Sequence, residues 1–362
     1  MVGLIMWPDR RLLDLFGIEF PIVLGPMAGV MDFELVVAVS EAGGLGSLPC
    51  AMLNADKARE QAGQIRSRTR KPFNFNFFCH RPPAPDNARE ASWRDRLEPY
   101  YLELGLDPNA PTNVAVRSPF DDALCSMVEE VQPAVASFHF GLPAPELLKR
   151  VKAAGCKVIS SATTADEARW LEDHGVDAVI AQGNEAGGHR GIFLSDDIST
   201  QAGTLALVPQ VVDAVKVPVI AAGGIADARG IAAAFMLGAA AVQIGTAYMH
   251  CPESKISAMH RKALAEAKDN STVLTNVMTG RPARGIVNRI IREQGPIGEV
   301  PAFPNSANAL APLRAAAEKA GSGDFSPLWS GQAAALGRSM PAGELTRKLA
   351  ADAQARLREF AA

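Results

Sequence analysis

The sequence predicts an α/β protein built on a (β/α)8 barrel, with an inserted segment and a helical C-terminal subdomain. Eight short apolar runs, rich in Val and Ile or in Phe, alternate with segments of helical character. Gly and Pro residues separate these runs, as expected for the turns of such a fold. The chain has 362 residues, which is enough for one barrel of about 250 residues with further segments attached.

The eight predicted strands each stop at Gly, Pro or a polar residue. In chain order they cover residues 21–27, 45–49, 73–78, 134–141, 157–162, 178–182, 218–224 and 240–245. An N-terminal helix that ends near Gly17 precedes the first of them, and Asn54 is a predicted N-cap. The helices predicted between the strands cover residues 32–42, 54–69, 120–131, 145–154, 165–174, 202–214 and 228–237.

A doubly wound open sheet is the alternative fold. Such a sheet requires a Gly-rich phosphate turn after its first strand, with G-x-G-x-x-G spacing. The turn at residues 25–29 (GPMAG) lacks that spacing. The barrel is therefore the favoured architecture.

The alternation of strands and helices is interrupted twice. Residues 79–119 combine prolines with charges and form a predicted insertion, so the barrel covers residues 1–78 and 120–252. Residues 253–327 are expected to form a helical cap together with the insertion, from segments such as 255–268 and 310–319. Residues 328–362 contain an amphipathic tail, which either packs back on the barrel or forms a solvated helix.

Composition argues against several classes of function. The net charge is −3, and Lys and Arg are scattered, so no basic face is expected for nucleic acid or an anionic membrane. The longest apolar stretch, residues 231–242, is too short to span a bilayer, and the N-terminus lacks a signal-peptide core. We therefore expect a cytoplasmic protein with a small neutral or anionic substrate, and the sequence leaves its oligomeric state open.

The five cysteines are odd in number and widely spaced, with no Cys-x-x-Cys pair. We expect reduced thiols and no metal site. A metal-dependent aldolase or isomerase is also disfavoured, because no cluster of His, Asp and Glu falls at the predicted strand ends.

The conspicuous polar and glycine residues follow the predicted strands, at the barrel edge where such folds carry their chemistry. Residues 181–191 (AQGNEAGGHRG) follow the sixth strand and place His189 on a glycine-rich loop. Glycines allow the backbone to approach a planar ligand closely, so His189 is the candidate catalytic residue. His139, at the end of the fourth strand, is a candidate for substrate binding, or else a hydrogen-bonded structural histidine.

A phosphate site is predicted where two glycine turns follow the seventh and eighth strands, at Gly223-Gly224 and Gly245-Thr246. Met27 and Ala28 could form an apolar floor for a flat ring, whereas Asn76 and Gln182 offer donors and acceptors to its edge. Each feature also has a structural explanation, as a tight turn or as a hydrogen bond at a strand end. Together they favour a phosphorylated planar cofactor.

These blocks resemble those of the nitronate monooxygenases, a family of FMN-dependent barrel enzymes formerly called 2-nitropropane dioxygenases. The matching blocks are residues 25–29, 72–78, 137–141, 181–191, 218–224 and 243–246, with further matches at 279–285 and 329–332. The resemblance implies His189 at the catalytic position and FMN contacts from Met27, Ala28, Asn76, Gln182, Gly187, Gly188, Gly223, Gly224, Gln243, Ile244, Gly245 and Thr246. The insertion at 79–119 departs from the common bacterial members, which leaves the substrate pocket open.

The resemblance implies oxidation of alkyl nitronates, and possible oxidation of nitroalkanes, by FMN and O2 to a carbonyl compound and nitrite. The sequence leaves open whether His189 is a neutral base or a cation that holds the nitronate. An FMN- and NAD(P)H-dependent enoyl-acyl-carrier-protein reductase is the first alternative, although Gln182 favours the monooxygenase. A flavin-binding protein without turnover is the second.

Overall fold

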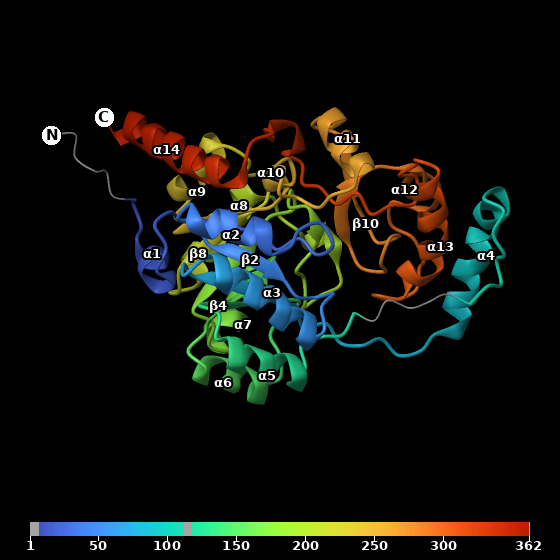
Figure 1. The fold of residues 1–362 in the computed structure, drawn as a ribbon, viewed down its shortest axis with the longest axis horizontal. Coiled ribbons are helices and arrows are strands. Elements are labelled where there is room, and N and C mark those ends of the chain that lie inside the picture. Colours follow the sequence, from blue (N-terminus) through green and yellow to red (C-terminus); the bar gives the residue numbers. More distant parts are fainter. Residues whose placement is uncertain (1–6, 112–116, 362) are drawn as a thin grey trace.

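Eight parallel strands form the centre of the structure, a computed structural model that describes residues 7–111 and 117–361 (Figure 1). The strands pair in the order β1-β9-β8-β6-β5-β4-β3-β2, and the bridge between Val23 and Leu45 joins the two outer strands. This confirms the predicted (β/α)8 barrel. The strands are Ile22–Leu24 (β1), Gly46–Pro49 (β2), Phe73–Phe78 (β3), Val135–His139 (β4), Lys157–Ala162 (β5), Ala178–Gln182 (β6), Val219–Ala222 (β8) and Ala241–Ile244 (β9).

The helices between the strands begin at side-chain caps in most cases. Asn54 accepts a hydrogen bond from the Lys57 amide at 2.9 Å, which confirms the predicted N-cap. The N-terminal helix α1 (Arg11–Phe16) ends at Gly17 as predicted, whereas residues 1–6 lie outside the described residues. The others are Phe33–Glu41 (α2), Ala55–Arg68 (α3), Asp122–Val131 (α5), Pro145–Ala153 (α6), Ala165–Asp173 (α7), Thr204–Ala214 (α8) and Ala228–Met236 (α9).

The last helix, α14 (Ala342–Ala361), takes the place of a helix after the eighth strand. It packs against α9 and α2, and Leu345, Leu349 and Ala353 enter the barrel core. The buried Tyr248 and Thr346 hydroxyls lie 2.8 Å apart and tie it to the short helix α10 (Thr246–Met249). None of the helices in the described ranges combines the length and apolar character that a membrane span requires.

A second hydrophobic core lies beside the barrel. The helices that form it are at the right of Figure 1. The segment 79–119 contributes α4 (Asn87–Glu103), whose Trp93, Leu97 and Tyr101 follow helical spacing and are buried. Trp93 Nε1 donates to the Ser306 carbonyl at 3.1 Å, and Tyr101 Oη donates to the Ala309 carbonyl at 2.6 Å. Residues 112–116 of this segment lie outside the described residues.

The C-terminal region completes this cap with helices and with a small sheet that the sequence analysis does not anticipate. The helices are Ala258–Glu266 (α11), Arg289–Gln294 (α12) and Ser306–Lys319 (α13). Strands β10 (Thr272–Thr275) and β11 (Ala283–Ile286) pair in antiparallel, and β11 also pairs with β7 (Gly188–His189). The cap sheet therefore includes the backbone of the candidate catalytic residue.

Candidate active site

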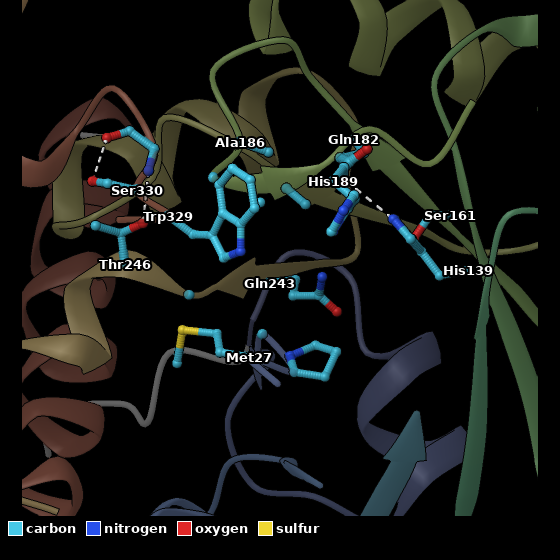
Figure 2. Close-up of a pocket in the computed structure, with 18 of the residues that line it drawn as sticks. Met27, His139, Ser161, Gln182, Ala186, His189, Gln243, Thr246, Trp329 and Ser330 are labelled. Atoms are coloured by element: carbon cyan, nitrogen blue, oxygen red, sulfur yellow. Dashed lines mark hydrogen bonds between the residues drawn. The ribbon is translucent and has the colours of Figure 1, made fainter. Parts of the chain in front are cut away.

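One cavity lies at the carboxyl ends of the barrel strands and extends beneath the cap (Figure 2). Thirteen of the predicted site residues line it: Met27, Ala28, Asn76, His139, Gln182, Gly187, Gly188, His189, Gly223, Gly224, Gln243, Gly245 and Thr246. Ile244 does not. Its side chain is buried in the barrel core, because neighbouring residues of a strand point to opposite sides, and only its backbone contributes, by accepting from the Gly25 amide at 2.8 Å.

Arg190 binds the backbone of the glycine-rich loop between β6 and β7. This side chain is fully buried, and its Nη1 and Nη2 donate to the carbonyls of Gly183 and Gln182, each at 2.6 Å. Its Nε donates to Gln201 at 3.0 Å. Burial lowers the pKa of Arg190 to about 10, so the guanidinium is still charged at neutral pH. Arg190 therefore fixes the start of the loop.

Arg190→Met is expected to lower the free energy of unfolding by about 3 kcal/mol or more, because it removes charge-assisted hydrogen bonds to two buried carbonyls. Chemical denaturation followed by circular dichroism measures this loss. The control is Arg169→Met, which removes an exposed ion pair to Asp166 and should change stability by less than about 1 kcal/mol. Equal stabilities of the two variants would contradict the role given to Arg190.

Gln182 is also committed to the loop. Its Nε2 donates to the His189 carbonyl at 2.9 Å, and its Oε1 accepts from the Gly191 amide at 2.7 Å. Both ends of the amide thus bind the backbone around His189. The side chain also lines the cavity, and its predicted contact with a ring edge stays a prediction.

Glu185 connects the glycine loop to α8. Its carboxylate accepts from the Thr204 amide at 2.8 Å and from the Thr204 hydroxyl at 2.8 Å. It thereby caps α8, whose N-cap residue Gly203 has no capping side chain. Gly223 and Gly224 lie against this connection with φ values of 111° and 70°, a backbone conformation that favours glycine.

A segment from the C-terminal region closes the other side of the loop. The Gly331 amide donates to Thr246 Oγ1 at 2.9 Å, and the Gln332 amide donates to the Glu185 carbonyl at 3.0 Å. In Figure 2 the Trp329 ring lies between the loop at Ala186 and the Gln243 side chain. Thr246 therefore orders this segment through its hydroxyl as well as lining the cavity.

His189 lies among aromatic rings, of which Trp329 lines the cavity. Its Nε2 is 2.9 Å from Thr279 Oγ1, and its ring centroid is 5.2 Å from Phe303 and 5.4 Å from Trp329. Burial, and then the nearby Arg117, hold the pKa of His189 well below its usual range. Its imidazole is consequently neutral at pH 7. Nδ1 has no hydrogen-bond partner in the described part of the chain, so it can accept a proton in the tautomer whose Nε2–H donates to Thr279.

His139 is hydrogen-bonded at both ring nitrogens. Its Nδ1 lies 3.0 Å from Ser161 Oγ, and its Nε2 lies 3.1 Å from the His189 carbonyl. Burial lowers its pKa to about 3, so it too is neutral at pH 7. With both nitrogens engaged, His139 supports the backbone of His189, as in the structural alternative for this residue; its role in substrate binding stays a prediction.

The cavity also contains polar groups that suit a flavin ring. Gln243 Oε1 is buried and has no partner among the described residues, so it can accept from a ring N–H. Asn76 donates its Nδ2 to Ser137 Oγ at 2.9 Å and leaves its Oδ1 without a partner in the same ranges. The thioether of Met27 lies near Gly245, where an added Cβ would be 3.6 Å from the sulfur. These residues fit a planar heterocycle above Met27.

The sequence analysis does not single out several of the residues that line the cavity. Phe78, Arg117 and Ser161 line the cavity, and they lie on three separate segments of the chain. No local signal distinguishes Arg117 from the other charges of the insertion. The block at 329–332 was noted only as a family match, since its contact with Thr246 spans 85 residues. Within the described ranges, no three His, Cys, Asp or Glu side chains form a candidate metal site.

The chain is similar to known proteins over nearly its whole length. The family model described as nitronate monooxygenase matches residues 9–352. A nitronate monooxygenase from Pseudomonas aeruginosa is 45% identical over 342 residues, covering 94% of this chain and 97% of that protein. One from Paraburkholderia phytofirmans is 43% identical, covering 97% and 98%.

Solved structures agree with these relatives. A nitroalkane oxidase from Streptomyces ansochromogenes superposes with a TM-score of 0.88 at 39% identity, covering 97% of this chain and 100% of that one. FabK from Thermotoga maritima is more distant, with a TM-score of 0.74 at 29% identity, covering 98% and 99%.

Proposed function

The chain belongs to the nitronate monooxygenase family of flavin-dependent oxidoreductases, and we propose that it oxidises alkyl nitronates with FMN and O2 to a carbonyl compound and nitrite. The observation that carries this proposal is the cavity at the barrel mouth. There a neutral His189 lines the same cavity as the glycine turns and as Gln243, whose Oε1 has no partner among the described residues. The relative at 45% identity is named nitronate monooxygenase and the structure at a TM-score of 0.88 is named nitroalkane oxidase, whereas FabK is more distant. This difference favours nitronate oxidation over the reductase alternative.

FMN is proposed because the glycine turns after β8 and β9 suit one monophosphate. Gly223, Gly224, Gly245 and Thr246 would hold the phosphate end, and Met27, Asn76 and Gln243 would hold the ring. When bound, the flavin supplies the redox chemistry, in which it accepts electrons from the nitronate and makes them available to O2. The protein supplies position, exclusion of water and proton transfer.

His189 is proposed as the base for neutral nitroalkanes. Thr279 engages Nε2, which leaves Nδ1 to take the proton from the α-carbon. The low pKa of His189 keeps the imidazole neutral at neutral pH, and in the tautomer whose Nε2–H donates to Thr279 the free lone pair lies on Nδ1. A preformed nitronate already lacks this proton and does not need the base.

The cytoplasmic location of the protein stays a prediction.

The cofactor is tested by its release from purified protein. We expect heat-released flavin to co-migrate with FMN and not FAD, at about one flavin per chain, because no dinucleotide fingerprint is present. Addition of propane 2-nitronate under air should then produce acetone and nitrite.

Three outcomes would contradict the proposal. Colourless protein that cannot be reconstituted with FMN would remove the flavin site. Consumption of NADPH with an enoyl thioester, without nitrite from any nitronate, would indicate the reductase. Bound FMN with neither activity would indicate a flavin-binding protein without turnover.

A further inference from the structure

Arg117 brings a positive charge into the cavity from outside the barrel. It lies at the end of the segment 79–119 and lines the cavity together with His189 and Asn76. Its guanidinium carbon is 5.9 Å from the centroid of the Phe303 ring, one of the rings that surround His189. The arginine therefore borders the space next to the proposed base.

The charge of Arg117 is not neutralised by an acidic side chain within the described residues. Burial lowers its pKa, and the charged group that acts on it is another cation, Arg314. Among the described residues, Glu185 is the one acidic side chain that lines the cavity, and its oxygens accept from Thr204. Arg117 is half-buried. A cation that is partly removed from water without a carboxylate partner is costly, so a site that keeps one is suited to an anionic ligand.

We propose that Arg117 binds the nitro oxygens of the substrate and stabilises the negative charge of the nitronate. This inference rests on the proposed function. When His189 removes the α-proton of a nitroalkane, the C–H electron pair forms the C=N bond and one negative charge moves onto the two nitro oxygens. A guanidinium can donate two parallel hydrogen bonds to two such oxygens. Arg117 would thus stabilise the charge that develops in the transition state.

The positive charge of Arg117 also favours the neutral form of His189. Arg117 and Arg281 are the cations that lower the pKa of His189, with Arg117 first. His139 and His80 also titrate nearby, but burial lowers their pKa values to about 3 and about 4, so both are neutral at pH 7. A cation near the imidazole disfavours the imidazolium and keeps the base unprotonated. Arg117 therefore acts on both partners of the proton transfer.

The variants Arg117→Met and Arg117→Gln test this proposal with FMN-loaded protein. Both should raise KM for propane 2-nitronate by about 10- to 100-fold, as expected for a lost charge-assisted hydrogen bond. Arg117→Lys should recover much of the affinity. In the two neutral variants the pH profile for a nitroalkane should also shift to higher pH, since His189 loses a repelling charge. A purely structural role would lower FMN content and would not produce this shift.

The matched control is Arg96→Met. Arg96 joins α4 to the cap through Gln294 and the Glu299 carbonyl, and it does not line the cavity. This variant should loosen the same segment and leave KM for the nitronate within about twofold. Full FMN loading with an unchanged KM and pH profile in both neutral variants of Arg117 would overturn the proposal.

A measurement on the unaltered holoprotein avoids dependence on any variant. Isobutyrate has the shape and charge of propane 2-nitronate but is not oxidised, whereas isobutyramide is its neutral counterpart. Calorimetric titration should give at least tenfold tighter binding of isobutyrate. Equal affinities in a protein that produces nitrite would overturn the role of Arg117 and leave the proposed function intact. Absence of FMN would contradict the proposed function itself.

Discussion

His189→Asn is expected to lower kcat/KM for a neutral nitroalkane by about 10²- to 10⁴-fold, the usual contribution of a general base. Oxidation of a preformed nitronate should fall much less, within about tenfold, because no C–H proton has to be removed. Asparagine preserves a polar side chain of similar size, so the loop and the flavin should remain. Steady-state assays of 2-nitropropane and of its nitronate, on variants with equal FMN content, measure the difference.

The pH dependence distinguishes a base from a cationic anchor. The pKa of His189 lies well below 6.5, so the imidazole is neutral at and above neutral pH and becomes protonated only as the pH falls through the lowered pKa. We expect kcat/KM for the nitroalkane to be flat from about pH 8 down past 6.5 and to decline only in more acidic solution. An anchoring imidazolium would instead lose nitronate affinity as the pH rises through an ordinary histidine pKa.

His174→Asn provides the control for these assays. His174 is exposed and stacks on Trp170, with ring centroids 3.8 Å apart, outside the cavity lining. Its replacement should alter neither substrate form. If His189→Asn oxidised the nitroalkane and the nitronate at the parental rates, His189 would have no part in the mechanism.

The barrel could be predicted because its determinants are local. Each strand is a short apolar run, and each turn carries Gly, Pro or a capping residue such as Asn54. The positions of the site residues follow from the same pattern, since parallel strands place their carboxyl ends on one edge. Ile244 was the exception, because the alternation of side chains along a strand points it into the core.

The helices and strands of the cap could be predicted less completely from local sequence patterns. The prolines of the segment 79–119 obscured the helical spacing of Trp93, Leu97 and Tyr101, whose partners lie about 200 residues later in α13. Strand β11 pairs with β10 and with β7, and the pairing with β7 joins distant segments of the chain. Arg117 likewise lies close to a residue that is distant in the chain, Phe303 of the C-terminal region.

The glycine loop was predicted with the right residues and an incomplete physical reason. Its glycines were expected to let backbone approach a flat ring. In the structure Gly187 also allows close contact with the C-terminal segment, and Gln182 and Arg190 hold the loop carbonyls and amides. The contact of Gly187 is with Ser330 and Gly331, more than 140 positions away, so the sequence near the loop does not indicate it.

Gly187→Val is therefore expected to abolish FMN binding. An added Cβ would lie 2.5 Å from the Gly331 nitrogen and 2.6 Å from the Ser330 carbonyl carbon, and backbone atoms at such distances must separate. Separation would break the Gly331–Thr246 hydrogen bond and open the cavity wall. The loss of packing should also lower stability by about 3 kcal/mol.

The flavin-to-protein ratio after gel filtration and the Tm of the apoprotein measure the two effects of Gly187→Val. Gly331→Val should behave alike, because its Cβ would lie 2.9 Å from the Glu185 carbonyl oxygen across the same contact. Gly63→Val is the control, since Gly63 lies on α3 with no atom within 4 Å of an added Cβ, and valine there should be tolerated. Stoichiometric FMN in both Gly187→Val and Gly331→Val would show that this contact does not form the cofactor site.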